Sequence, residues 1–165
     1  MHIVPHVIDQ GATAIIAASV LTVIGGGSLA GRVVMGILSD RIGTRSSFAI
    51  CFIGTSAALL WLLVAEEVWM LYLFAAVFGF AFGGMYALGS PMAAELFGLR
   101  SHGVIFGVAI FGGTIGGAIG PTLAGHIFDI SGSYQMAFLT CAILSMMGLT
   151  QISFLRPIHY LKEER

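Results

Sequence analysis

The sequence has few charged residues. Lys, Arg, Asp and Glu make up 9% of its 165 residues, whereas a soluble domain carries about 25%. Hydrophobic residues reach 58%, and a soluble chain of this length lacks the interior to bury so much apolar surface. The formal net charge of −1 excludes the clustered basic surface that nucleic-acid binding requires. We therefore expect an all-α integral membrane protein that lies in the lipid bilayer and binds no nucleic acid.

The sequence also lacks the usual patterns of enzymes and metal proteins. Its two cysteines, Cys51 and Cys141, each lie in a long apolar run and form no disulfide or metal pattern. There is no P-loop and no Ser–His–Asp or paired-acid arrangement. Residues 25–31 match the glycine spacing of a dinucleotide-binding turn, but the strand and acid that should follow are missing. We expect no cofactor, no metal ion and no enzymatic activity.

Charged residues divide the chain into five apolar runs of 19 to 27 residues. A helix of about 20 apolar residues crosses the hydrocarbon core, and helices satisfy their own backbone polar groups in lipid. We expect one membrane domain, residues 1–165, with spans at 12–35, 47–65, 68–94, 103–128 and 134–155. Five crossings place all seven Lys and Arg on one side, which predicts a cytoplasmic C-terminus and an external N-terminus in the cell (inner or plasma) membrane.

Glycine is concentrated in the first, third and fourth spans. Pairs four residues apart occur at Gly27/Gly31 and Gly79/Gly83 and in the fourth span from residue 112 to 120. Because small residues let membrane helices approach closely, we expect these three spans to be packed inner helices and the second and fifth spans to face lipid. Helix packing without moving parts would explain the glycines equally well.

Arg32 is the residue most suggestive of function. It lies eight residues before Asp40, about 12 Å along a helix from the expected cytoplasmic surface. A charge at this depth is costly unless it faces a cavity or a partner, and a guanidinium suits a carboxylate substrate. Snorkelling, or an ion pair with Glu95 or Asp40, is the alternative. Tyr86 and Ser90 share a helix face and could line a cavity or bond a neighbouring helix.

A short charged connection follows the first span. Arg41 and Arg45 can reach Glu95 at the end of the third span, so that the cluster would hold one helix arrangement and release it in another. A plain cytoplasmic loop explains the arginines, but not Asp40 or the glycine spacing. The candidate latch consists of Gly36, Asp40, Arg41, Gly43, Arg45, Glu95 and Arg100.

The fourth span carries a candidate helix-bending motif. Proline removes a backbone hydrogen bond, and the glycines around it make the segment pliable. Transporters place moving parts in such interrupted helices. The motif residues are Gly107, Gly116, Gly120, Pro121 and Gly125.

The segment from Gly31 to Arg45 resembles the signature loop G-x-x-x-D-R-x-G-x-R of the major facilitator superfamily. The glycine–proline pattern of the fourth span resembles the antiporter motif of that family, with Ala124 where the pattern has glycine. Residues 2–5 and 125–134 resemble its monocarboxylate-porter and oxalate–formate-antiporter branch.

The resemblance implies a partial facilitator fold, with five transmembrane helices corresponding to helices 8–12 of twelve and residues 1–12 ending helix seven. It also implies secondary transport of small organic anions, such as monocarboxylates or oxalate/formate, by alternating access, with Arg32 facing the substrate. Ser28 stands where the branch can carry an acid, which speaks against proton coupling there, and the lysine of its oxalate exchangers is absent from the fourth span.

The length of the chain is the main departure from the family. Five spans build at most half of a transport path, so we expect a fragment, a truncated reading frame or one part of a split protein. Its expected partners are the missing N-terminal transporter half, the bilayer and the anion, and transport by this chain alone is not expected. The alternatives are an exporter of drugs or metabolites in which Arg32 is structural, and a non-transporting membrane scaffold or remnant.

Overall fold

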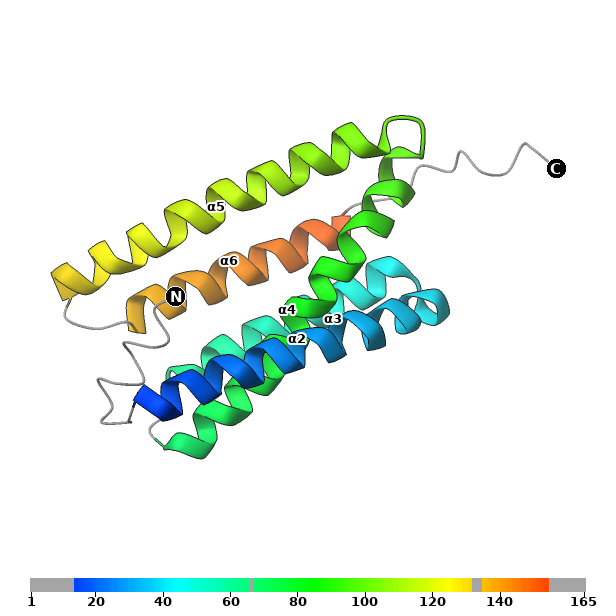
Figure 1. The fold of residues 1–165 in the computed structure, drawn as a ribbon. Helices are drawn as coiled ribbons and strands as arrows, with labels where there is room; N and C mark the ends of the chain where they lie inside the picture. Colours follow the sequence, from blue (N-terminus) through cyan, green and yellow to red (C-terminus); the bar gives the residue numbers. More distant parts are fainter. Residues whose placement is uncertain (1–13, 66, 132–134, 155–165) are drawn as a thin grey trace.

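The computed structural model describes residues 14–65, 67–131 and 135–154, and these residues form α-helices joined by short turns. The helices are α2 (Ala14–Ile42), α3 (Thr44–Leu62), α4 (Val68–Phe97), α5 (His102–Ser131) and α6 (Gln135–Phe154) (Figure 1). The expected all-α class is therefore confirmed for the described part of the chain.

Four of the helices are long and apolar enough to cross a membrane. They are α2, α3, α4 and α5, whereas the apolar stretch described in α6, Phe138–Ile152, is shorter. The fifth crossing therefore stays a prediction. Helix α2 continues to Ile42, past the end expected at residue 35, because Gly36 lies inside the helix and the turn comes at Gly43. Gly43 has a φ of 87°, a conformation that side chains other than glycine rarely adopt.

Helices α2 and α4 are in backbone contact along their glycines. A Cβ added at Gly31 would overlap the carbonyl of Phe80, and one added at Gly83 would overlap the backbone of Ser28. Gly27 and Gly79 face the opposite backbone in the same way. The expected close packing of the first and third spans is thus confirmed, and its cause is the absence of side chains at these four positions.

Helix α3 packs against both α4 and α6. The hydroxyl of Ser56 donates a hydrogen bond of 2.9 Å to Ser145 of α6, and both side chains are buried. Gly148 of α6 lies against the ring of Phe52. The expectation that the second and fifth spans only face lipid is therefore incomplete, because these small polar and glycine residues make a helix–helix contact.

Helix α5 departs from the expectation of a packed inner helix. It runs along one side of the molecule, beside α6 (Figure 1). Apart from the adjoining residues and backbone of α5 itself, no atom of the described residues lies within 4 Å of a Cβ built on seven of its glycines: Gly103, Gly107, Gly112, Gly113, Gly116, Gly117 and Gly120. Within the described residues the prediction was wrong, since these glycines of α5 face open space rather than another helix.

Candidate functional site

Arg32 and Tyr86 lie together at mid-helix depth. The guanidinium carbon of Arg32 is 5.8 Å from the centroid of the Tyr86 ring, in a cation–π contact. Arg32 lies ten residues before the end of α2 at Ile42, and Tyr86 lies eleven residues before the end of α4 at Phe97. Both are therefore about 15 Å from the same end of the bundle. The structure brings together two of the three residues predicted to bind substrate.

The Arg32–Tyr86 pair lies on an open face. Both residues are exposed, and Tyr86 retains 64% of its accessible surface. In lipid, an exposed guanidinium at this depth would be costly. A polar cavity or further protein over this face would remove that cost.

An aromatic ladder on α4 leads to this pair. The residues Phe74, Phe78, Phe82 and Tyr86 follow one another at four-residue spacing, with ring centroids 5.2, 5.6 and 5.1 Å apart. Phe74 is buried, whereas Phe82 and Tyr86 are exposed. The result is an apolar wall that ends beside a cation, and such a wall suits an anion with a small apolar body. We did not predict this ladder from the sequence, although the spacing of the aromatic residues was a visible signal.

Ser90 does not reach the Arg32–Tyr86 pair. Its hydroxyl lies 3.1 Å from Nε2 of His102, so it joins α4 to the beginning of α5. The His102 ring also stacks on Phe106, with centroids 5.7 Å apart. Of the two roles expected for Ser90, the structure therefore shows the hydrogen bond to a neighbouring helix. His102 had no assigned role, and its Nδ1 is buried without a hydrogen-bond partner among the described residues.

The predicted latch is assembled differently from the expectation. The carboxylate of Glu95 accepts a hydrogen bond from the hydroxyl of Thr44, rather than from Arg41 or Arg45. Arg45 instead donates from Nε to the carbonyl of Ile152 in α6, at 3.0 Å. Thr44 was missed because its direction depends on how α3 leaves the turn at Gly43.

The remaining latch residues lie apart from this contact. The side chains of Asp40, Arg41 and Arg100 are exposed, and Gly36 has open space beside it. The contacts that tie α3 to α4 and α6 at this end of the bundle are therefore made by Thr44 and Arg45.

The predicted bending motif lies within an unbroken helix. Helix α5 includes Pro121 and continues to Ser131, and α4 likewise includes Pro91. Gly107, Gly116 and Gly120 have open space beside them, and Gly125 lies one turn beyond Pro121 in the same helix. Among the residues that the structure describes, no group of three or more His, Cys, Asp or Glu side chains could hold a metal ion.

Long apolar helices and a cation near the middle of one of them, on an open face, are typical of a multi-pass membrane protein that handles a polar solute. A family model of the Major Facilitator Superfamily matches residues 3–165. The chain belongs to this superfamily, whose members are transporters and not enzymes.

The curated relatives include several monocarboxylate transporters. Monocarboxylate transporter 12 of Mus musculus is 25% identical over 98% of this chain and 34% of its own length. Monocarboxylate transporter 7 of Homo sapiens is 30% identical over 95% of this chain and 31% of its own length. The MFS transporter asaE of Aspergillus flavus is 27% identical over 79% of this chain. The chain thus spans about a third of the length of these relatives.

Proposed function

We propose that this chain supplies helices 8–12, in the C-terminal half, of a secondary transporter that moves small organic anions by alternating access. Monocarboxylates and oxalate or formate are the substrates we favour. The observation that carries the proposal is the Arg32 guanidinium beside Tyr86, exposed about 15 Å from the end of its helix. The relatives of this chain include monocarboxylate transporters, which supports the same substrate class.

The chemistry of the site fits an anion with a small apolar part. The guanidinium of Arg32 offers several donors in a planar fork that matches a carboxylate. The exposed ring of Tyr86 lies beside it, and the exposed ring of Phe82 lies next to that of Tyr86, so the two rings can cover the rest of the substrate. Binding a carboxylate would neutralise a charge that is costly at this depth.

The moving parts in this proposal are at the ends of the helices. The contact from Thr44 to Glu95 ties α3 to α4, and Arg45 ties α3 to α6. Breaking and remaking these contacts would let the helices shift as the transport path opens to one side or the other. The open glycine face of α5 would pack against helices that lie outside this chain.

Anion uptake by a transporter that contains this chain tests the proposal. Replacing Arg32 by Gln should reduce lactate, formate or oxalate uptake at least tenfold, because the amide carries no charge. Arg32→Lys should retain part of the uptake. Val33→Ala changes an exposed neighbour on the same helix and serves as the control. Uptake by Arg32→Gln equal to that of the unchanged protein would refute the substrate role.

The Tyr86 contact also supports a second candidate function. Because the ring already partners the guanidinium, Arg32 could be structural in an exporter of uncharged or cationic compounds. Competition experiments separate the two functions. Inhibition of transport by lactate, formate and oxalate supports the anion transporter, whereas inhibition by uncharged or cationic compounds alone supports the exporter.

A further inference from the structure

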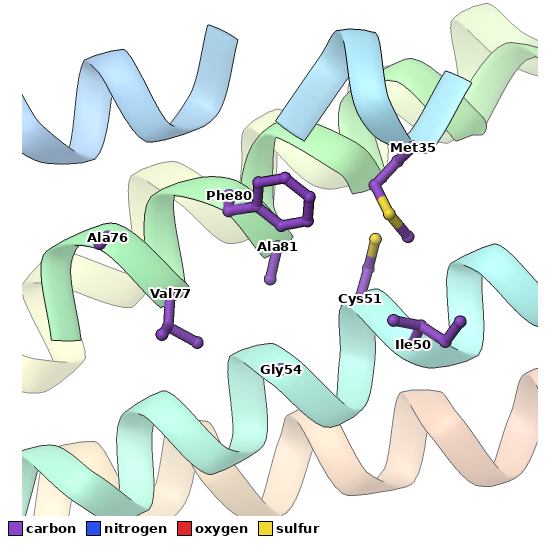
Figure 2. Close-up of a pocket in the computed structure, with 8 residues that line it drawn as sticks. All are labelled: Met35, Ile50, Cys51, Gly54, Ala76, Val77, Phe80 and Ala81. Carbon is purple, nitrogen blue, oxygen red and sulfur yellow. The ribbon is translucent and has the colours of Figure 1, made fainter. Parts of the chain in front are cut away.

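An apolar crevice of about 350 Å³ lies between α2, α3 and α4. Figure 2 shows Val77, Phe80 and Ala81 of α4 near Gly54 of α3, with Met35 and Cys51 facing each other at one end. Val77 and Tyr86 are nine residues apart on α4, which places them on opposite sides of an α-helix. The crevice is therefore on the side of α4 that faces away from the Arg32–Tyr86 pair.

The crevice opens on the apolar surface of the helices. Met35 and Cys51 are each 1% exposed and form its inner wall, whereas Ile50 and Val77 are 46% and 40% exposed at its mouth. Cys51 lies seven residues after the beginning of α3 at Thr44, which is about 10 Å along the helix. In a membrane-spanning chain, the medium at this depth is the acyl chains of the nearer leaflet.

A cation lies on the water side of the crevice. Val34, Leu38 and Arg41 are spaced four and three residues apart, so they form one stripe on α2. Leu38 packs against the cluster that contains Met35 and Cys51, two residues that line the crevice, so this stripe leads from that cluster to the end of α2. Arg41 is exposed at the end of α2, where its guanidinium suits a lipid phosphate.

We propose that the crevice binds one acyl chain of an anionic phospholipid whose headgroup phosphate binds Arg41. An unfilled apolar void would forfeit the dispersion contacts of its walls, and water would find no polar partners there. An acyl chain of the same leaflet fills the void and keeps its phosphate at the depth of Arg41. The proposal needs only a membrane-spanning chain and is independent of the substrate.

Photocrosslinking on the unchanged chain tests this proposal. The chain is reconstituted in nanodiscs with phosphatidylglycerol that carries a diazirine halfway along one acyl chain, and the labelled residues are mapped by mass spectrometry. We expect labelling to concentrate at residues 50–54 and 76–81. An equal amount of phosphatidylcholine with the same probe should label these residues at least threefold less.

Matched variants separate the two parts of the site. Val77→Phe places a ring in the mouth and should lower labelling of residues 50–54 at least fivefold. Ile53→Phe makes the same kind of change at a 54% exposed position outside the crevice and should leave the labelling of Ile50, Cys51 and Gly54 unchanged. Arg41→Gln should abolish the preference for phosphatidylglycerol, and Arg100→Gln should retain it.

Three results would overturn the proposal. The first is labelling of the unchanged chain spread evenly over all its lipid-facing helices. The second is a preference for phosphatidylglycerol that survives Arg41→Gln. The third is a benzophenone at position 50 that crosslinks to another copy of the chain rather than to lipid, because a second copy would then fill the crevice.

Discussion

At the residue scale, a single cation accounts for most of what the sequence suggested about function. The depth of Arg32 could be predicted because it follows from its distance to Asp40 along one helix. Its contact with Tyr86 could not, because that contact depends on how α2 and α4 rotate against each other. Thr44 was missed for a similar reason: the turn at Gly43 sets its direction towards Glu95.

The Thr44–Glu95 hydrogen bond gives the first prediction. Thr44 is buried, and its hydroxyl donates to the carboxylate, so Thr44→Val should lower the free energy of unfolding by about 1–2 kcal/mol. Unfolding in mixed detergent micelles measures this change, and Thr44→Ser should restore most of it.

Thr114→Val is the matched control for Thr44→Val. Thr114 is exposed, and its hydroxyl bonds only the carbonyl of Ile110 in its own helix among the contacts described. Its replacement should change the free energy of unfolding by less than about 0.5 kcal/mol. Equal effects of the two valine variants would show that the Thr44 contact contributes nothing specific.

At the scale of the helices, glycine spacing predicted one contact correctly and another incorrectly. The Gly27/Gly31 and Gly79/Gly83 pairs predicted how α2 and α4 meet, because each helix supplies its own stripe of small residues. The same glycine pattern on α5 predicted close packing against another helix, but no described helix packs on these glycines. The end of α2 was also uncertain, because either Gly36 or Gly43 could form a turn as judged from the sequence. Of these two glycines, only Gly43 has a positive φ in the structure.

Two glycine-to-alanine substitutions in α2 should have opposite effects. Gly31→Ala would drive a Cβ into the backbone of α4 and should lower the free energy of unfolding by about 1–3 kcal/mol. Gly25→Ala points into open space and should be neutral or stabilise the helix by up to about 1 kcal/mol. Unfolding of both variants under one set of detergent conditions measures the difference. A Gly31→Ala protein as stable as Gly25→Ala would contradict the close packing of α2 and α4.

At the scale of the whole molecule, arginines and tryptophans lie at opposite ends of the bundle. Arg41, Arg45 and Arg100 lie at or near the α2–α3 and α4–α5 turns, whereas Trp61, Glu67 and Trp69 gather at the α3–α4 turn at the other end (Figure 1). This separation supports the proposed orientation, with the arginine end in the cytoplasm.

Cysteine labelling tests this orientation. In a chain with Cys51 and Cys141 replaced by Ala, Arg100→Cys should react with an impermeant maleimide only from the cytoplasmic side. Glu67→Cys should react only from outside. Labelling of intact cells and of inverted vesicles measures both positions, and the reverse pattern would contradict the orientation.

The five helices of the described residues and the family could be predicted from apolar runs and a signature loop, since both are local properties of the sequence. The surroundings of α5 and of the open Arg32 face could not, because the chain spans only about a third of the length of the relatives it matches. A role of Arg32 in transport therefore depends on what covers this residue in the membrane.

The accessibility of position 32 to a water-soluble reagent measures directly whether water covers this residue in the membrane. In a transporter that contains this chain, Arg32→Cys should react with a charged, membrane-impermeant thiosulfonate, because a water-filled path reaches that depth. In a second variant, Tyr86→Cys, Arg32 is retained and can still bind the anion. Lactate or oxalate at saturating concentration should slow the modification of this cysteine. A cysteine at position 32 that never reacts, or a Tyr86→Cys reaction that no organic anion slows, would contradict the account.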